Sequence, residues 1–202
     1  MKKLQSSLKN MLLVLTGICV IATAILAYVN QLTTEPIALA KATALKTAIA
    51  EVIPGFDNNP VAESKTVDLT IEGKELQFKI YPATKENQSI GAAVESVSLG
   101  FGGDLRVLVG FDLDGTILNY SILETSETPG LGSKASTWFH KGTKGSIIGL
   151  SLKDKMLTVS KDGGQVQAIT ASTITSRAFL KAVNQAYMAY ANKTVSQTTT
   201  QK

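Results

Sequence analysis

The chain has 202 residues, and its 20 Lys and Arg against 16 Asp and Glu give a net charge of +4. Three of the basic residues, Lys2, Lys3 and Lys9, precede position 10, so the remainder is nearly neutral and excludes the clustered basic face of a nucleic-acid-binding protein. One cysteine, Cys19, and one histidine, His140, exclude a disulfide framework, an iron–sulfur cluster and a histidine-rich metal site.

An apolar stretch covers residues 11–29, within a run from 10 to 34 that contains no charge. At about 1.5 Å per residue its helix would be about 29 Å long, close to the ~30 Å hydrocarbon core of a bilayer. Because lysines precede the stretch, the positive-inside rule keeps residues 1–10 in the cytoplasm. We therefore predict a single-pass anchor in membrane lipid, with the main domain on the extracytoplasmic side.

Two other N-terminal signals are less consistent with the sequence. A cleaved signal peptide needs a small-x-small site after its apolar part, but Ala22 and Ala24 lie inside the apolar run. A lipoprotein site needs a small residue before Cys19, and Ile18 stands there. The sequence favours an uncleaved anchor.

A second helix is predicted over residues 30–53, next to the membrane. Thr33 or Thr34 would cap it, and Glu35 and Pro36 are typical of a first turn. The helical stripe that follows stops before Pro54. We expect this helix to connect the anchor to a domain that begins with a loop at residue 54.

Short β-type runs follow, separated by turn signals. Strands are predicted at 67–71, 76–81, 91–99, 105–111, 117–123, 147–152 and 156–160, with a short helix within 134–142. The sequence at Asp112–Gly115 favours a hairpin turn over a calcium loop, because Ser121 stands where such a loop needs a Glu. His140 is expected at the surface or at a pocket edge.

A long amphipathic helix closes the domain. Phe179, Val183, Ala186 or Tyr187, and Tyr190 recur at three- and four-residue spacing, with a first turn near residues 175–177. The polar segment 193–202 is predicted to be a disordered tail. Strands with flanking helices indicate one α+β domain over residues 54–192. No helix follows the glycines at 100–103, so a dinucleotide-binding fold for NAD is not expected.

Hydroxyl side chains crowd residues 170–175, directly before that helix. The start of a helix favours an anion by about 0.3–1 kcal/mol, and Arg177 could add a charge-assisted hydrogen bond. The plain alternative is that such a hydroxyl cluster only caps the helix. The segment resembles the flavinylation motif of the FMN-binding family, Ser/Thr-Gly-Ala-Ser/Thr-x-Thr, although Ala171 replaces Gly, Ser172 replaces Ala and Gln167 replaces a frequent Asp.

A second segment strengthens that resemblance. Residues 127–132, with the sequence ETPGLG, match a signature of the same family at every position. Pro129-Gly130 predicts a tight turn, and the lack of a side chain at Gly130 and Gly132 would let backbone approach a flat ring. Glu127 would either order the turn or face solvent. The Gly-Phe-Gly-Gly run at 100–103 is a weaker match to the same family.

The resemblance implies an FMN bound covalently, through its phosphate, to the hydroxyl of Thr175 by a flavin transferase, with Thr173 as the next candidate acceptor. The cofactor-binding residues it implies are Thr175, Thr173, Ser172, Ser176, Glu127, Thr128, Pro129, Gly130, Leu131 and Gly132. No catalytic or metal-binding residue is expected. The protein would be an electron-carrying subunit of an Rnf-type ion-translocating ferredoxin:NAD oxidoreductase, similar to its G subunit, with other membrane and peripheral subunits as partners. The alternatives are the C subunit of a sodium-translocating NADH:quinone oxidoreductase, or a non-redox membrane-anchored binding or assembly module.

Overall fold

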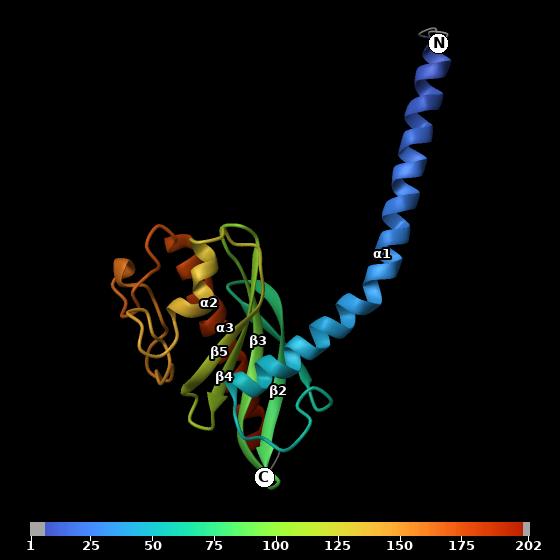
Figure 1. Cartoon of the computed structure of the whole chain (residues 1–202). Coiled ribbons are helices and arrows are strands. Elements are labelled where there is room, and N and C mark those ends of the chain that lie inside the picture. The colour runs from blue at the N-terminus through green and yellow to red at the C-terminus, as the bar shows by residue number, and fades with distance from the viewer. Residues whose placement is uncertain (1–6, 200–202) are drawn as a thin grey trace. The chain divides into compact units, whose positions relative to one another are not determined.

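The structure is a computed structural model that describes residues 7–199. Two compact units make up the chain, Met1–Ala44 and Leu45–Lys202 (Figure 1). Helix α1, Leu8–Val52, contributes to both of them. The second unit holds the sheet, the remaining helices and the candidate site.

The first unit consists of the greater part of α1. Among the described residues, α1 is the one helix long and apolar enough to cross a membrane. The separate helix start predicted near Pro36 is absent, because α1 runs through this proline without a break. Thr33 and Thr34 do not cap a new helix; they donate their hydroxyls back to the carbonyls of Val29 and Asn30, at 2.9 and 2.6 Å.

The second unit is built on a five-stranded antiparallel sheet whose strands follow one another in chain order. The strands are β1 Lys65–Ile71, β2 Lys74–Lys85, β3 Gln88–Leu99, β4 Asp104–Asp112 and β5 Ile117–Thr125. These five strands confirm the five strand predictions before residue 125, and with the helices they confirm the α+β class.

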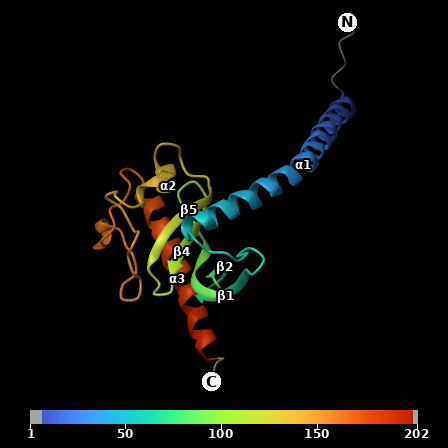
Figure 2. The same cartoon turned by 60° about the horizontal axis from the view of Figure 1, so that its bottom comes forward.

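Apolar side chains cover both faces of the sheet. Helix α3, Thr173–Thr199, packs along one face, as its position in Figure 2 shows, through a stripe that includes Phe179, Val183 and Ala186. The last turns of α1 pack on the other face through Ile49 and Val52. Gly110 of β4 lies under this contact, where any Cβ would collide with the Val52 carbonyl. The burial of Phe179, Val183 and Ala186 in the core confirms the apolar stripe predicted for α3.

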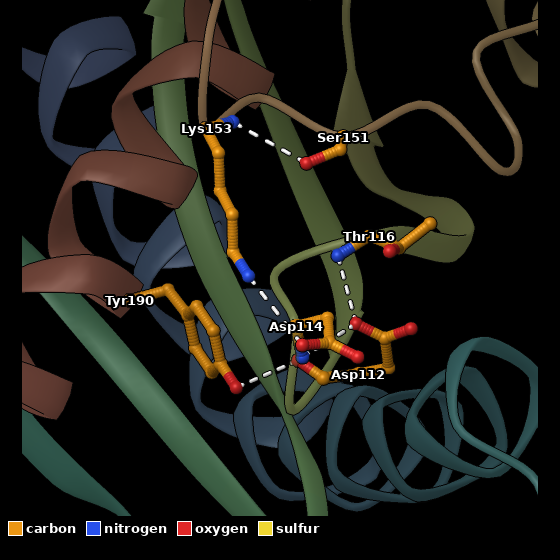
Figure 3. A network of polar contacts seen from close by, with 6 residues as sticks. All are labelled: Asp112, Asp114, Thr116, Ser151, Lys153 and Tyr190. Atoms are coloured by element: carbon orange, nitrogen blue, oxygen red, sulfur yellow. Dashed lines mark hydrogen bonds and ion pairs between the residues drawn. The ribbon is translucent and has the colours of Figure 1, made fainter.

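The turn between β4 and β5 is a hairpin turn, as predicted (Figure 3). Asp112 accepts the backbone N–H groups of Asp114 and Thr116 on one carboxylate oxygen, at 2.9 and 2.8 Å. Tyr190 of α3 donates its hydroxyl to the Asp112 carbonyl at 2.7 Å, and Lys153 pairs with Asp114. The carboxylates here thus order the loop, and no group that could hold a metal occurs among residues 7–199.

The connection from β5 to α3 contains little regular structure. It holds a short 3₁₀ helix at Gly132–Lys134, helix α2 at Ala135–Trp138, and another 3₁₀ turn at Ser160–Asp162. Helix α2 confirms the short helix near Trp138. The strands predicted at 147–152 and 156–160 are wrong, since only single bridges, Thr116 with Ser151 and Val159 with Val166, occur there. Their apolar residues are buried in the same core cluster as the sheet and α3, without pairing as strands.

Helix α3 continues to Thr199, so the predicted domain end at residue 192 falls inside it. Positions 200–202 of the predicted tail lie outside the described residues. Near its start, Phe179 stacks on Phe139 with ring centroids 4.2 Å apart and meets Tyr120 edge-on at 4.8 Å. These contacts fix the N-terminal end of α3 against the sheet and helix α2.

Candidate functional site

A pocket of about 380 Å³ lies where the N-terminus of α3 meets the loop after β5. Its walls come from three segments far apart in the sequence, and one of them includes Thr175. The lining residues are Phe101, Glu127, Thr128, Leu131, Gly132, Ala171, Ser172, Thr173, Ile174 and Thr175. Phe101, Leu131 and Ile174 are 69%, 42% and 53% exposed, so the lining is apolar and open to solvent on these sides.

The pocket contains a buried pair of a hydroxyl and a carboxylate. Thr175 is 1% exposed and Glu127 is 7% exposed. The Thr175 hydroxyl donates to Oε2 of Glu127 at 2.9 Å, across 48 residues of chain. Oε1 of the same carboxylate accepts the backbone N–H of Phe101 at 2.7 Å. Glu127 therefore joins three segments, and neither alternative predicted for it describes this role fully.

The loop at residues 127–132 forms the predicted tight turn. The N–H of Leu131 donates to the Thr128 carbonyl at 3.2 Å, and Gly130 has the positive φ, +74°, that a turn with Pro before Gly favours. Thr128, Leu131 and Gly132 line the pocket together with Glu127, whereas Pro129 and Gly130 of the same turn are not part of its lining. A Cβ on Gly130 would meet nothing within 4 Å.

Gly132 is the glycine that close packing at the site requires. A Cβ there would overlap the Glu127 carboxylate and lie 2.8 Å from the Thr175 hydroxyl oxygen. Gly100 similarly leaves space for the other carboxylate oxygen of Glu127. Two glycine-containing turns thus enclose one carboxylate, which explains why the Gly-rich run at 100–103 and the loop at 127–132 belong to the same site.

The segment before α3 gives the acceptor its position in the first helical turn. Ser172 precedes the helix, and its carbonyl accepts the N–H of Ser176 at 3.0 Å. Thr175 is therefore three residues into the turn and is not the cap. The N–H groups of the first turn have no intrahelical acceptor and point out of the helix end. Ser176 is buried but does not line the pocket. Its hydroxyl donates to the Ser172 carbonyl and accepts the N–H of Ile169, at 2.9 Å each.

Position 171 has a left-handed backbone, with φ +61° for Ala171. Glycine adopts this conformation without strain, whereas in another residue it costs about 1 kcal/mol or more. The departure from the flavinylation motif at this position therefore leaves the turn geometry in place but adds local strain.

Comparison with known proteins agrees with this geometry. Residues 100–188 match the profile of the FMN-binding domain family. The G subunit of the ion-translocating oxidoreductase complex of Yersinia pestis is 36% identical over 172 residues, which cover 82% of this chain and 81% of the relative. The G subunit of the Na⁺-translocating ferredoxin:NAD⁺ oxidoreductase complex of Acetobacterium woodii is 30% identical over 189 residues, covering 90% and 89%. The chain belongs to this G-subunit family.

In this G-subunit-family chain the pocket residues fit an FMN group. The first-turn N–H groups of α3 suit a phosphate, and the exposed side chains of Phe101, Leu131 and Ile174 suit a flat ring. Lys161 reaches the same segment, donating its amine to the Thr173 hydroxyl at 3.3 Å. The one group of the pocket lining that opposes an anion is the carboxylate of Glu127.

Arg177 does not contribute to the pocket in the way the sequence indicated. Its guanidinium forms two hydrogen bonds to Asp162, at 2.8 and 2.7 Å, and this contact lowers the pKa of the Asp162 carboxyl. The pair lines a second pocket, of about 310 Å³, farther along α3. There Lys181 is also paired, with Glu72 at 2.7 Å, so both of these cations are already neutralised.

The remaining sequence expectations concern single residues. His140 is half-buried, stacks on Tyr120 at 4.3 Å and contacts the Asn119 amide oxygen at 3.0 Å, away from the pocket lining. Phe101 and Ile174 line the pocket but were not predicted as site residues. The Gly-Phe-Gly-Gly run at 100–103 was the available signal for Phe101, whereas nothing in the sequence singled out Ile174.

Proposed function

We propose that this chain is the flavin-carrying, electron-transferring subunit of a membrane-bound ion-translocating oxidoreductase complex, with FMN attached through its phosphate to Thr175. The bound flavin would supply the capacity to accept and pass on electrons. The observation that carries the proposal is the position of the Thr175 hydroxyl, in the first turn of α3 and facing a pocket walled by the loop at 127–132.

The chain's own residues would hold the group in three ways. First-turn N–H groups of α3 would bind the phosphate, which carries one negative charge as a diester. Phe101, Leu131 and Ile174 would contact the ring, because these exposed apolar side chains gather around one pocket, and such clusters mark ligand-binding surfaces. Thr173 and Ser172 would complete the polar wall next to the acceptor.

The proposed partners follow from the relatives and from α1. The other membrane and peripheral subunits of the complex would exchange electrons with the flavin, and a flavin transferase would attach it. Helix α1 would lie in lipid as a single-pass anchor in the bacterial inner membrane. The lysines at positions 2, 3 and 9 support an orientation with the flavin domain on the periplasmic side.

The attachment is tested with Thr175→Ala, with Thr173→Ala as the matched control. After expression with a flavin transferase, intact-mass measurement should show FMN minus one water on the parent and on Thr173→Ala, and no addition on Thr175→Ala. In-gel fluorescence after denaturation should give the same ranking. Thr175→Ala should still fold, because a hydrogen bond to a carboxylate contributes about 1.5–3 kcal/mol, less than the roughly 5–15 kcal/mol that stabilise a typical domain. Covalent flavin on Thr175→Ala would contradict the assignment and direct attention to Thr173.

The orientation is tested separately with a reporter enzyme that is active only outside the cytoplasm, fused after residue 192. It should be active on the native sequence, and neutral replacements of Lys2, Lys3 and Lys9 should reduce its activity. An inactive reporter on the native sequence would contradict the periplasmic placement without affecting the attachment site.

A further inference from the structure

We propose that Glu127 accepts the proton that leaves the Thr175 hydroxyl when the flavin phosphoester forms, and that it afterwards holds this proton against the phosphate. The proposal rests on the proposed function, since it takes Thr175 as the acceptor. It assigns a chemical role to a carboxylate that would otherwise only order a turn.

The starting geometry is that of a hydroxyl already aligned for proton transfer. The Thr175 Oγ1–H points at Oε2 of Glu127 with the oxygens 2.9 Å apart. The other carboxylate oxygen is held by the Phe101 N–H at 2.7 Å, which fixes the direction of the carboxylate. A threonine hydroxyl is a weak nucleophile until a neighbouring base takes its proton, and a base must lie within hydrogen-bond reach to do so.

The surroundings of Glu127 favour this role over a purely structural one. Among the described residues no basic side chain forms an ion pair with Glu127. The carboxylate accepts hydrogen bonds from two neutral groups, the backbone N–H of Phe101 and the hydroxyl of Thr175. The carboxylate therefore has no counter-charge in direct contact, and the hydroxyl proton of Thr175 lies next to its free lone pairs. The backbone of Gly132 also lies directly against the pair, since a Cβ there would overlap the carboxylate and lie 2.8 Å from the hydroxyl oxygen.

The step balances as a phosphoryl transfer from a flavin phosphoanhydride, such as a flavin adenine dinucleotide. Oγ1 of Thr175 forms a bond to the flavin-side phosphorus, the phosphoanhydride bond breaks, and the nucleotide monophosphate leaves with that bond's electron pair. The proton from Oγ1 passes to Oε2 of Glu127. No electron is gained or lost by the flavin in this step.

The product geometry explains why the proton should stay. Once esterified, Oγ1 has no hydrogen, so the bond that it donates to Glu127 in the unmodified chain is lost. An ionised Glu127 would then face an ester oxygen and a phosphate charge across a distance suited to a hydrogen bond. Two anions in direct contact repel each other, so a protonated Glu127 that donates to a phosphate oxygen is favoured over a second negative charge at this position.

The test uses the full-length chain, purified without flavin, and a purified flavin transferase supplied with flavin adenine dinucleotide. Glu127→Gln keeps the shape and an acceptor oxygen but cannot take the proton. Its turnover number for flavin transfer should fall roughly 100-fold, the usual contribution of a general base, while the KM for the chain stays within about twofold. Glu95→Gln is the matched control, since it neutralises another buried carboxylate away from the pocket, and its rate should equal that of the parent.

A second readout detects the retained proton. Infrared spectra of the parent should gain the C=O band of a protonated carboxylic acid on flavin attachment. Glu127→Gln, loaded by prolonged reaction, should lack this band, and Glu95→Gln should retain it. If Glu127→Gln does not fold, the parent spectrum decides alone, because the absence of a new band there would overturn the proposal.

The outcomes separate the two proposals. A parent chain that accepts no covalent flavin, or accepts it at a residue other than Thr175, contradicts the proposed function. A parent modified at Thr175 together with a Glu127→Gln variant that keeps its turnover number overturns the role of Glu127 alone. A fall in both Glu127→Gln and Glu95→Gln would show that loss of any buried charge lowers the rate, and would equally overturn it.

Discussion

Two glutamates, Glu95 on β3 and Glu127 after β5, are buried to a similar extent, with 9% and 7% of their surface exposed. Glu95 accepts a hydrogen bond from the Tyr81 hydroxyl at 2.9 Å and forms an ion pair with Arg106. Glu127 has neutral donors instead. Similar burial thus accompanies different surroundings: Glu95 has a counter-charge, whereas Glu127 has only neutral donors, one of which is the proposed flavin acceptor.

The largest expected effect comes from removing the guanidinium of Arg106, which forms the ion pair with Glu95. Arg106→Met should destabilise the domain, because the carboxylate then stays buried without a counter-charge. Breaking a buried pair in this way typically costs about 3–5 kcal/mol, and we expect about 2 kcal/mol here because Arg106 is half exposed. Urea denaturation measures the loss. Adding Glu95→Gln to Arg106→Met should recover part of it, and no recovery would contradict an electrostatic cause.

A second prediction concerns the glycines around Glu127. Gly132→Ala should push the Glu127 carboxylate and the Thr175 hydroxyl apart, which costs about 1–3 kcal/mol and lowers flavin attachment. Gly130→Ala provides the control, since its Cβ enters open space and the cost, about 1 kcal/mol, comes only from its positive φ. Thermal unfolding and intact mass measure the two effects. Equal flavin contents in the two variants would show that the close packing at Gly132 does not affect flavin attachment at Thr175.

A third prediction concerns how the stability of the domain depends on pH through two buried tyrosines, Tyr81 next to Glu95 and Tyr190 of α3. Burial, and next the charge of Glu95, raise the pKa of the Tyr81 hydroxyl above its ordinary value. Burial likewise raises the pKa of Tyr190 to about 12. The folded state therefore keeps protons that the unfolded chain loses above about pH 10, so stability is intact below that pH and falls as pH rises from 10 towards 12.

Tyr81→Phe should make this alkaline loss of stability less steep, because one of the phenols that titrates is removed. Urea midpoints measured at several values between about pH 8 and 11 give the slope. Thr175→Val, which alters the partner of Glu127 but removes no phenol, is the matched control and should keep the parental slope. An unchanged slope in Tyr81→Phe would contradict the prediction.

The smallest expected effect is that of Ala171→Gly. Glycine removes the strain of the left-handed backbone but makes the unfolded chain more flexible, so the net gain should be about 0.5 kcal/mol or less. Flavin attachment at Thr175 should be unchanged. A thermal unfolding scan measures the shift, and a clear loss of stability would mean that Ala171 is not strained.

The sheet and α3 could be predicted from the sequence because their core residues repeat at the spacing of each element. Val107, Val109 and Phe111 alternate along β4, and Phe179 and Val183 share one side of α3. Part of the prediction for residues 139–172 is wrong because buried residues such as Ile147 and Leu157 lie in irregular backbone. In such backbone, buried residues do not recur at a fixed spacing, so the sequence pattern cannot reveal the local structure.

The candidate site could be predicted only in outline. The motifs pointed to Thr175 and to the loop at 127–132, and both line the same pocket. The hydrogen bond from Thr175 to Glu127 spans 48 residues, and nothing local in the chain encodes it. Arg177 stands beside the motif in sequence, but helical rotation directs it towards Asp162. Spacing along the chain reveals which residues share an element, not which partners they meet across elements.

The pocket beside Thr175 also bears on when this protein can mature. Phe101, the loop at 127–132 and the segment at 171–175 come together only in the folded domain, so a nascent chain lacks the aligned hydroxyl and carboxylate. A transferase that depends on this pair would pass over unfolded or misassembled chains and leave them colourless. The yellow colour of the attached flavin would then indicate that the domain had folded before the chain joined any larger assembly.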